Sequence, residues 1–311
     1  MDAGSAIAGL KVLGVPTSAG AFAPGQEQAP AALRAAGLIG RLGDAGLDVE
    51  DMGDSSVWRW RPDPDNPRAQ NRDAVAATAA QTAARVERAV DGDRPLLLLG
   101  GDCTVELGTV AGHLARSERM GLIYFDVHPD LNTPQSVHEG AFDWMGVAHM
   151  LGVEGADPVV RGFGPRDPLL DDEQILLFSW GAEQATIFER EQIEARGLEQ
   201  IPLAEVASDP SAAAGRALEG FGARFERLLI HFDVDTIDFT DAPLSENTGR
   251  NEGLSLDAAF TALSVLLASE RLNALTITEL NPLHGAEDGA TLERFAAALA
   301  GALGRAVARP S

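Results

Sequence analysis

Five residues with metal-binding side chains recur at a spacing of two in two short segments. Asp126, His128 and Asp130 alternate directly after one apolar run, and Asp233 and Asp235 alternate directly after another. In an extended chain this spacing directs side chains to the same side of the backbone. Carboxylates this close raise one another's pKa and repel unless a cation neutralises them. The two segments together therefore predict a metal site rather than a pair of turns or caps.

Two further apolar runs end in side chains that could join this site, namely Cys103 and Glu279. Mainly oxygen ligands with one nitrogen ligand favour manganese over zinc. Taken singly, an aspartate after a strand is most often a turn former or helix cap, which is our interpretation of Asp102, Asp238 and Asp241. A lone cysteine is most often a small buried apolar residue, so Cys103 alone leaves packing and metal binding both open.

The elements that must position these residues alternate between short apolar runs and alanine-rich amphipathic stretches. Most runs are continuously apolar, as in Leu96–Leu99, which is typical of parallel strands covered by helices on both faces. We therefore predict βαβ units that form either a barrel or an open sheet, with the chemistry at the carboxyl ends of the strands. His231 falls inside an expected strand and is predicted to pack in the core. The expected strands are 11–15, 47–52, 95–99, 121–125, 174–180, 199–203, 228–232 and 274–277, and the expected helices include 31–42 and 140–151.

The charge of the chain narrows the classes of partner. Against 24 Lys and Arg stand 47 Asp and Glu, a net charge of -23, which argues against nucleic acid and membrane surfaces as partners. No apolar run approaches the roughly 20 residues that span a bilayer. One cysteine, and residues 1–9 without the layout of a signal peptide, predict a protein of the reducing cytoplasm. Because no linker or repeat interrupts the chain, residues 1–311 are expected to form a single domain.

Three of these segments resemble the signatures of a known family, the ureohydrolases, which include arginase, agmatinase and formimidoylglutamase. Residues 100–103 resemble the family's Gly-Gly-Asp-His, residues 126–134 its Asp-Ala-His-x-Asp-x-Asn-Thr-Pro, and residues 233–235 its Asp-x-Asp. With 14–16 near one end and 279–282 near the other, the resemblance covers nearly the whole chain. It implies a three-layer α/β/α fold with an open, mainly parallel sheet of about eight strands, two Mn²⁺ ions, and a homo-oligomer, commonly a trimer or hexamer.

The resemblance also implies a role for each matched residue. Asp126 and Asp233 would bridge both ions, Cys103 and Asp130 would complete one shell, and His128 and Asp235 the other. Glu279 would face the guanidinium or amidine group of the substrate, and Asn132 would lie where arginases hold the amino-acid end. Irregular loops at 57–67, 135–144 and 183–188 would grip the rest of the substrate, and from them Glu139 and Glu183 are predicted substrate contacts.

Two positions depart from the family pattern. Cys103 stands where the family has its first histidine ligand, and its softer thiolate invites zinc or iron. Asp143 stands where a family loop carries a proton-shuttling histidine, for which His138 and, less directly, His284 are candidate substitutes. At both positions the chain resembles the branch of the ureohydrolase family that hydrolyses hydroxyguanidines such as Nω-hydroxyarginine. Such substrates are less basic than guanidines, so less depends on an enzymic acid.

The function expected from these residues is a binuclear manganese hydrolase that cleaves a linear C–N bond of a guanidino, hydroxyguanidino or amidine compound. A hydroxide between the ions would attack the trigonal carbon, Glu279 would orient that carbon, and Asp126 or Asp143 would move the proton. Two alternatives remain at this stage. One is a metal-poor pseudo-ureohydrolase with a binding or regulatory role, and the other is a single-metal zinc or iron enzyme that uses Cys103.

Overall fold

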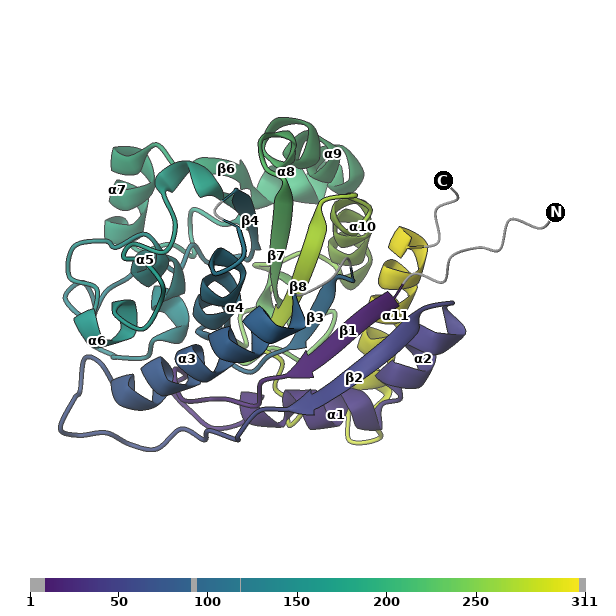
Figure 1. Ribbon diagram of the computed structural model, residues 1–311, viewed down its shortest axis with the longest axis horizontal. Helices are drawn as coiled ribbons and strands as arrows, with labels where there is room; N and C mark the ends of the chain where they lie inside the picture. The colour runs from purple at the N-terminus through teal and green to yellow at the C-terminus, as the bar shows by residue number, and fades with distance from the viewer. Residues whose placement is uncertain (1–8, 91–93, 118, 308–311) are drawn as a thin grey trace.

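One parallel sheet organises the protein, whose computed structural model describes residues 9–90, 94–117 and 119–307 (Figure 1). Within these ranges eight strands pair in the order β2-β1-β3-β8-β7-β4-β5-β6, every pair parallel. The sheet is open, as predicted, and not a barrel. The prediction about residues 1–9 falls outside the described part of the chain except at Gly9. The strands are β1 Gly9–Gly14, β2 Asp48–Asp54, β3 Leu96–Leu99, β4 Met120–Phe125, β5 Ile175–Trp180, β6 Glu199–Pro202, β7 Arg227–Asp233 and β8 Leu272–Thr278.

Successive residues of each strand point to opposite faces of the sheet, so these apolar strands present apolar side chains on both faces. Helices cover both faces and bury these side chains. Leu97 and Leu99 of β3 pack in one apolar core with α1, α2, α8, α9, α10 and α11, whereas Leu96 and Leu98 pack in the other with α3 to α7. The three-layer prediction is thereby confirmed. The helices are α1 Ala29–Ala35, α2 Leu38–Asp44, α3 Arg72–Ala89, α4 Val105–Leu114, α5 Gly146–Met150, α6 Pro158–Arg161, α7 Ile187–Arg196, α8 Leu203–Ser208, α9 Pro210–Gly220, α10 Leu256–Leu267 and α11 Ala290–Val307.

Two of the expected helices are interrupted in the structure. The helix expected at 31–42 is two helices, because Gly37 adopts a left-handed conformation with φ 80° between α1 and α2. The helix expected at 140–151 begins late, with a 3-10 turn at Asp143–Met145 followed by α5. Gly140 there has φ 59°, and the N–H groups of Phe142 and Asp143 bond the carbonyl of Gly20 instead of continuing a helix.

The two glycines after β3 allow the chain to pass close to its neighbours. A Cβ at Gly101 would lie 1.7 Å from the carbonyl oxygen of Thr17, and one at Gly100 would lie 2.7 Å from that of Ile277. The Gly101 carbonyl in turn accepts a hydrogen bond of 2.8 Å from the N–H of Glu279. This close approach brings the chain after β3 against the end of β8.

Within the described residues, no helix has both the length and the apolar content needed to cross a bilayer.

Candidate metal centre

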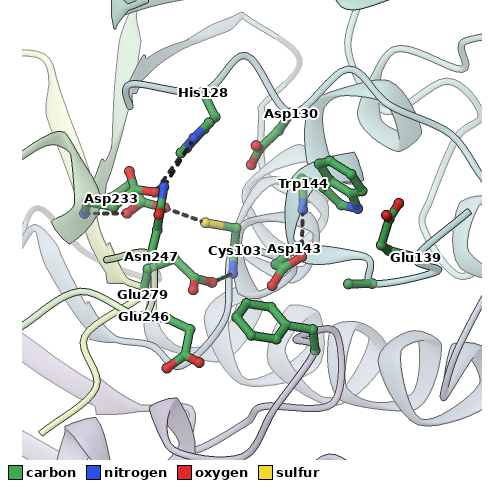
Figure 2. A pocket seen from close by; sticks show the side chains of 13 residues that line it. Cys103, His128, Asp130, Glu139, Asp143, Trp144, Asp233, Glu246, Asn247 and Glu279 are labelled. Carbon is green, nitrogen blue, oxygen red and sulfur yellow. Dashed lines mark hydrogen bonds and ion pairs between the residues drawn. The ribbon is translucent and has the colours of Figure 1, made fainter. Parts of the chain in front are cut away.

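The carboxyl ends of four adjacent strands deliver the predicted ligands to one place. Because β3, β8, β7 and β4 are consecutive in the sheet, the residues that follow them converge at one edge. They form part of a cavity of about 260 Å³ (Figure 2). Its lining comprises Phe22, Cys103, His128, Asp130, Glu139, Ala141, Asp143, Trp144, Asp233, Asp235, Glu246, Asn247 and Glu279.

Among the described residues, two groups of side chains place their ligand atoms within 4.8 Å of one another. One group is Asp126, His128 and Asp235, in which Nδ1 of His128 lies 2.9 Å from Oδ2 of Asp235. The other is Cys103, Asp126, His231 and Asp233, in which Sγ of Cys103 lies 2.8 Å from Oδ2 of Asp233. Asp126 belongs to both groups, so the two are contiguous.

The buried carboxylates fit a site for cations. Oδ2 of Asp126 and Oδ1 of Asp235 are buried and have no hydrogen-bond partner among the described residues. Burial, and then the charge of Asp235, raises the pKa of Asp126 to about 6. Burial and the charges of Asp235 and Asp126 likewise hold the pKa of Asp233 well above its ordinary range. Since the described lining includes no lysine or arginine, divalent cations are the groups that suit these acids.

The neighbouring carboxylates also shift the pKa values of the thiol and the imidazole of the site. Burial, followed by the charges of Asp233 and Glu279, raises the pKa of Cys103 well above its ordinary value. A bound cation would reverse this, because coordination deprotonates a thiol. Partial burial lowers the pKa of His128, but the charges of Asp235 and Asp126 outweigh it and hold that pKa well above its usual value.

The backbone is strained at two of the site residues. Asp130 has φ 50° and Glu279 has φ 60°, a conformation uncommon for side chains other than glycine. Three hydrogen bonds stabilise this strained conformation of Glu279. Its N–H donates to Gly101, its Oε1 accepts from the N–H of Cys103 at 2.9 Å, and its Oε2 accepts from Nε2 of Gln26 at 3.1 Å. Such strain is typical of residues whose side chains are aimed for a function.

Comparison with known proteins decides the family. A family model described as the Arginase family matches residues 8–304. The chain belongs to the Arginase family. It is 29% identical to arginase of Bacillus caldovelox over 280 residues, covering 88% of this chain and 91% of the relative. It is 28% identical to human arginase-1 over 284 residues, covering 89% and 86%. The native crystal structure of the Bacillus caldovelox arginase superposes with a TM-score of 0.83 at 25% identity, covering 97% of this chain and 99% of that one.

Membership of the Arginase family makes the chain a metal-dependent ureohydrolase, a hydrolase of the class that acts on guanidino C–N bonds. The predicted ligands Cys103, His128, Asp130, Asp233 and Asp235 line the cavity, and Asp126 lies buried in both ligand groups. Asp130 lines the cavity but belongs to neither group, and it accepts a hydrogen bond from the Tyr124 hydroxyl. The predicted substrate and proton-transfer residues Glu139, Asp143 and Glu279 line it as well.

Four other candidates in this Arginase-family chain lie away from the cavity lining. Asn132 is buried, and its Oδ1 accepts hydrogen bonds from the Ser136 and Thr186 hydroxyls, so its predicted substrate contact finds no support in this geometry. Glu183 is exposed outside the lining and finds none either.

Neither candidate for the missing shuttle histidine reaches the cavity. His138 is exposed and contacts Arg68, and Nδ1 of His284 contacts the carbonyl of Ser245. Closeness in sequence to Glu139 and Glu279 therefore does not bring either ring into the lining.

Sequence reasoning missed several residues of the cavity. Phe22, Glu246 and Asn247 come from loops without strand or helix periodicity, and Nδ2 of Asn247 lies 3.3 Å from Nε2 of His128. No motif in the sequence singled them out. Asp102 and Asp238 form turns, as predicted, because each carboxylate accepts a hydrogen bond from the backbone N–H two residues further on. Asp241 instead accepts from the N–H of Leu256, the first residue of α10.

Proposed function

We propose that this protein is a binuclear manganese hydrolase that cleaves the linear C–N bond of a guanidino-type substrate, with a hydroxyguanidine as the favoured class. The observation that carries the substrate class is the composition of the cavity. Among the described residues that line it, His128 is the one imidazole, and it lies in a ligand group. An acid–base histidine of the kind used on strongly basic guanidines has no counterpart in this lining.

Two contiguous ligand groups support a pair of ions. A carboxylate common to both groups, that of Asp126, is suited to bridging, and Asp233 lies beside it. Oxygen donors predominate over nitrogen and sulfur donors, which favours Mn²⁺, although the thiolate of Cys103 would also suit zinc or iron. Two such ions bound together would lower the pKa of water to near neutrality and so supply a nucleophile.

The acidic lining supports a cationic substrate. Glu139, Glu246 and Glu279 present carboxyl groups to the cavity. Of these, Glu279 is the best suited to hold a guanidinium carbon in place, because both its oxygens are fixed by hydrogen bonds. The small cavity and the lack of basic residues in the described lining favour a small molecule over a macromolecule.

Asp143 is suited to deliver the proton that the leaving amine needs. Burial, and then the charges of Asp102 and Glu246, raises the pKa of Asp143 to about 8. A carboxyl group with this pKa holds its proton at neutral pH and can donate it. A hydroxyguanidine is less basic than a guanidine and so depends less on the strength of this acid.

A product screen tests the proposal. The manganese-supplemented protein is incubated with arginine, agmatine, Nω-hydroxyarginine and simple amidines, and urea, hydroxyurea and ammonia are measured. We expect release of product that chelation abolishes, with the highest kcat/KM for a hydroxyguanidine. A purified protein that binds no divalent cation, or that acts on none of these compounds, would contradict the proposal.

A further inference from the structure

A second imidazole reaches the metal centre from inside the sheet. His231 lies within β7, is completely buried, and places Nε2 3.5 Å from Sγ of Cys103. Its ligand atom also lies within 4.8 Å of those of Asp126 and Asp233. The prediction that His231 is a core residue is therefore right about its burial but incomplete, because the ring faces ligand atoms as well as packed side chains.

The ring of His231 is held from its far side by a buried carboxylate. Nδ1 lies 3.4 Å from Oε2 of Glu106 in α4, and both side chains are at most 1% exposed. Oε1 of Glu106 has no hydrogen-bond partner among the described residues. If Nδ1–H donates to this carboxylate, the lone pair of Nε2 is left free on the side of Cys103. A metal-bound histidine is commonly oriented by just such a carboxylate on its other nitrogen.

The plane of the ring is fixed as well. His231 stacks on Tyr124 of the neighbouring strand β4, with ring centroids 4.0 Å apart and planes 2° apart. The hydroxyl of Tyr124 donates to Asp130, one of the predicted ligands. The contacts with Glu106 and Tyr124 therefore fix the orientation of the imidazole ring, with Nε2 directed toward Cys103.

We propose that His231 binds, through Nε2, the cation that Cys103 binds, and that Glu106 is its positioning residue. This inference rests on the proposed function, since it supposes that a cation occupies the Cys103 group. It gives a role to the buried carboxylate of Glu106, whose Oε2 faces His231 and whose Oε1 has no hydrogen-bond partner among the described residues. It also places a nitrogen donor in a shell where a thiolate stands in place of the family's first histidine. An imidazole suits iron and zinc, which the thiolate also suits.

A competing explanation is a hydrogen bond from Thr278, whose Oγ1 lies 3.2 Å from Nε2 of His231. In that case His231 would be a packed core residue with no metal bond. The two explanations differ in what happens to bound metal when His231 is changed.

Metal binding of His231→Gln separates them. The purified variant and the wild type are dialysed against Mn²⁺ alone, and the bound ions are counted over a range of free concentrations. We expect the variant to hold one of the two ions more than about 100-fold more weakly, because loss of an outer partner alone typically costs about 10- to 100-fold in metal affinity. Glu106→Gln should weaken the same ion less. An unchanged affinity for both ions in His231→Gln would overturn the proposal.

A matched control is available in His113→Gln. His113 is also a buried histidine, 1% exposed in α4, but its Nδ1 bonds the carbonyl of Thr109 within its own helix. This variant should bind both ions with the wild-type affinity. Comparable losses in His113→Gln and His231→Gln would mean that a general loosening of the core causes them, which would also overturn the proposal.

A second measurement needs no variant. In the cobalt-substituted wild type, each metal-bound imidazole gives a strongly shifted, exchangeable N–H proton resonance. We expect two such resonances, from His128 and His231, and a single one would overturn the proposal. If the wild type binds no divalent cation at all, the proposed function fails. If it binds two ions but shows one shifted resonance, His231 alone is wrongly assigned.

Discussion

The backbone N–H of Cys103 donates a hydrogen bond to Oε1 of Glu279, with 2.9 Å between nitrogen and oxygen. The contact joins the predicted first metal ligand to the predicted substrate carboxylate across the ends of β3 and β8, two neighbouring strands. Because the donor is the backbone, a change of the side chain at position 103 leaves this hydrogen bond in place. Metal preference and substrate orientation can therefore be changed separately.

Replacement of the thiolate should change the preferred metal. In Cys103→His a borderline nitrogen donor replaces a soft sulfur, so the ratio of bound manganese to zinc should rise several-fold. The measurement is metal analysis after dialysis against equal concentrations of the two ions. KM for the substrate should stay within about threefold of wild type, because Glu279 keeps its partner. An unchanged metal ratio would mean that Cys103 is not a ligand.

Loss of the charge at position 279 should impair catalysis while metal binding is kept. Glu279→Gln preserves the shape of the side chain but removes the anion that pairs with the substrate cation. A charged hydrogen bond of this kind contributes about 1.5–3 kcal/mol, so kcat/KM should fall by about 10- to 200-fold. Glu139→Gln is the control, because Glu139 lies at the exposed rim of the cavity and should cost less. Wild-type kcat/KM in Glu279→Gln would remove this residue from the substrate site.

The sheet could be predicted from sequence because most of its strands contain short, continuously apolar runs such as Leu96–Leu99. Each of the eight expected runs overlaps an observed strand. The helix breaks could not be predicted in the same way. The break at Gly37 follows from a local left-handed conformation, and the late start of α5 follows from hydrogen bonds to distant Gly20. Periodicity reports neither of these.

The predicted ligands could be found because they follow strands at a spacing of two, a pattern that the backbone itself orients. Glu246 and Asn247 could not, because a long irregular loop carries them back to the cavity. The position of His231 inside a strand predicts packing in the core and nothing more. Its metal-facing side depends on α4, which places Glu106 behind the ring, and on β4, which places Tyr124 beside it.

Removal of bound metal should lower stability. The cavity brings together the carboxylates of Asp130, Asp233, Asp235 and Glu279, which repel one another unless cations lie between them. An ion that fills its site at 100 times its Kd adds about 2.7 kcal/mol. Exhaustive chelation should therefore lower Tm by about 4 °C for each ion that is removed. Differential scanning fluorimetry with and without Mn²⁺ measures this, with Mg²⁺ as a control ion. A Tm that is the same with and without Mn²⁺ would argue against a preformed metal site.

The raised pKa of Asp143 should appear in the pH dependence of stability. Its pKa is about 8 in the folded protein and about 4 in an unfolded chain, so between these values the folded state binds the extra proton. Its contribution to stability is therefore greatest below about pH 4 and is lost as pH rises through about 8. Asn cannot ionise, so the chelated Asp143→Asn variant should gain stability relative to chelated wild type from pH 5 to pH 8.5.

Urea denaturation of the two proteins at several pH values measures this difference. Asp63→Asn is the control with the opposite sign. The N–H of Asn71 donates to Asp63 and lowers its pKa, so the Asp63 contribution is lost only as pH falls below its ordinary range. The stability difference between Asp63→Asn and wild type should therefore be flat from pH 5 to pH 8.5. If the difference for Asp143→Asn is equally flat, Asp143 is ionised at neutral pH and does not hold the proton that the leaving amine needs.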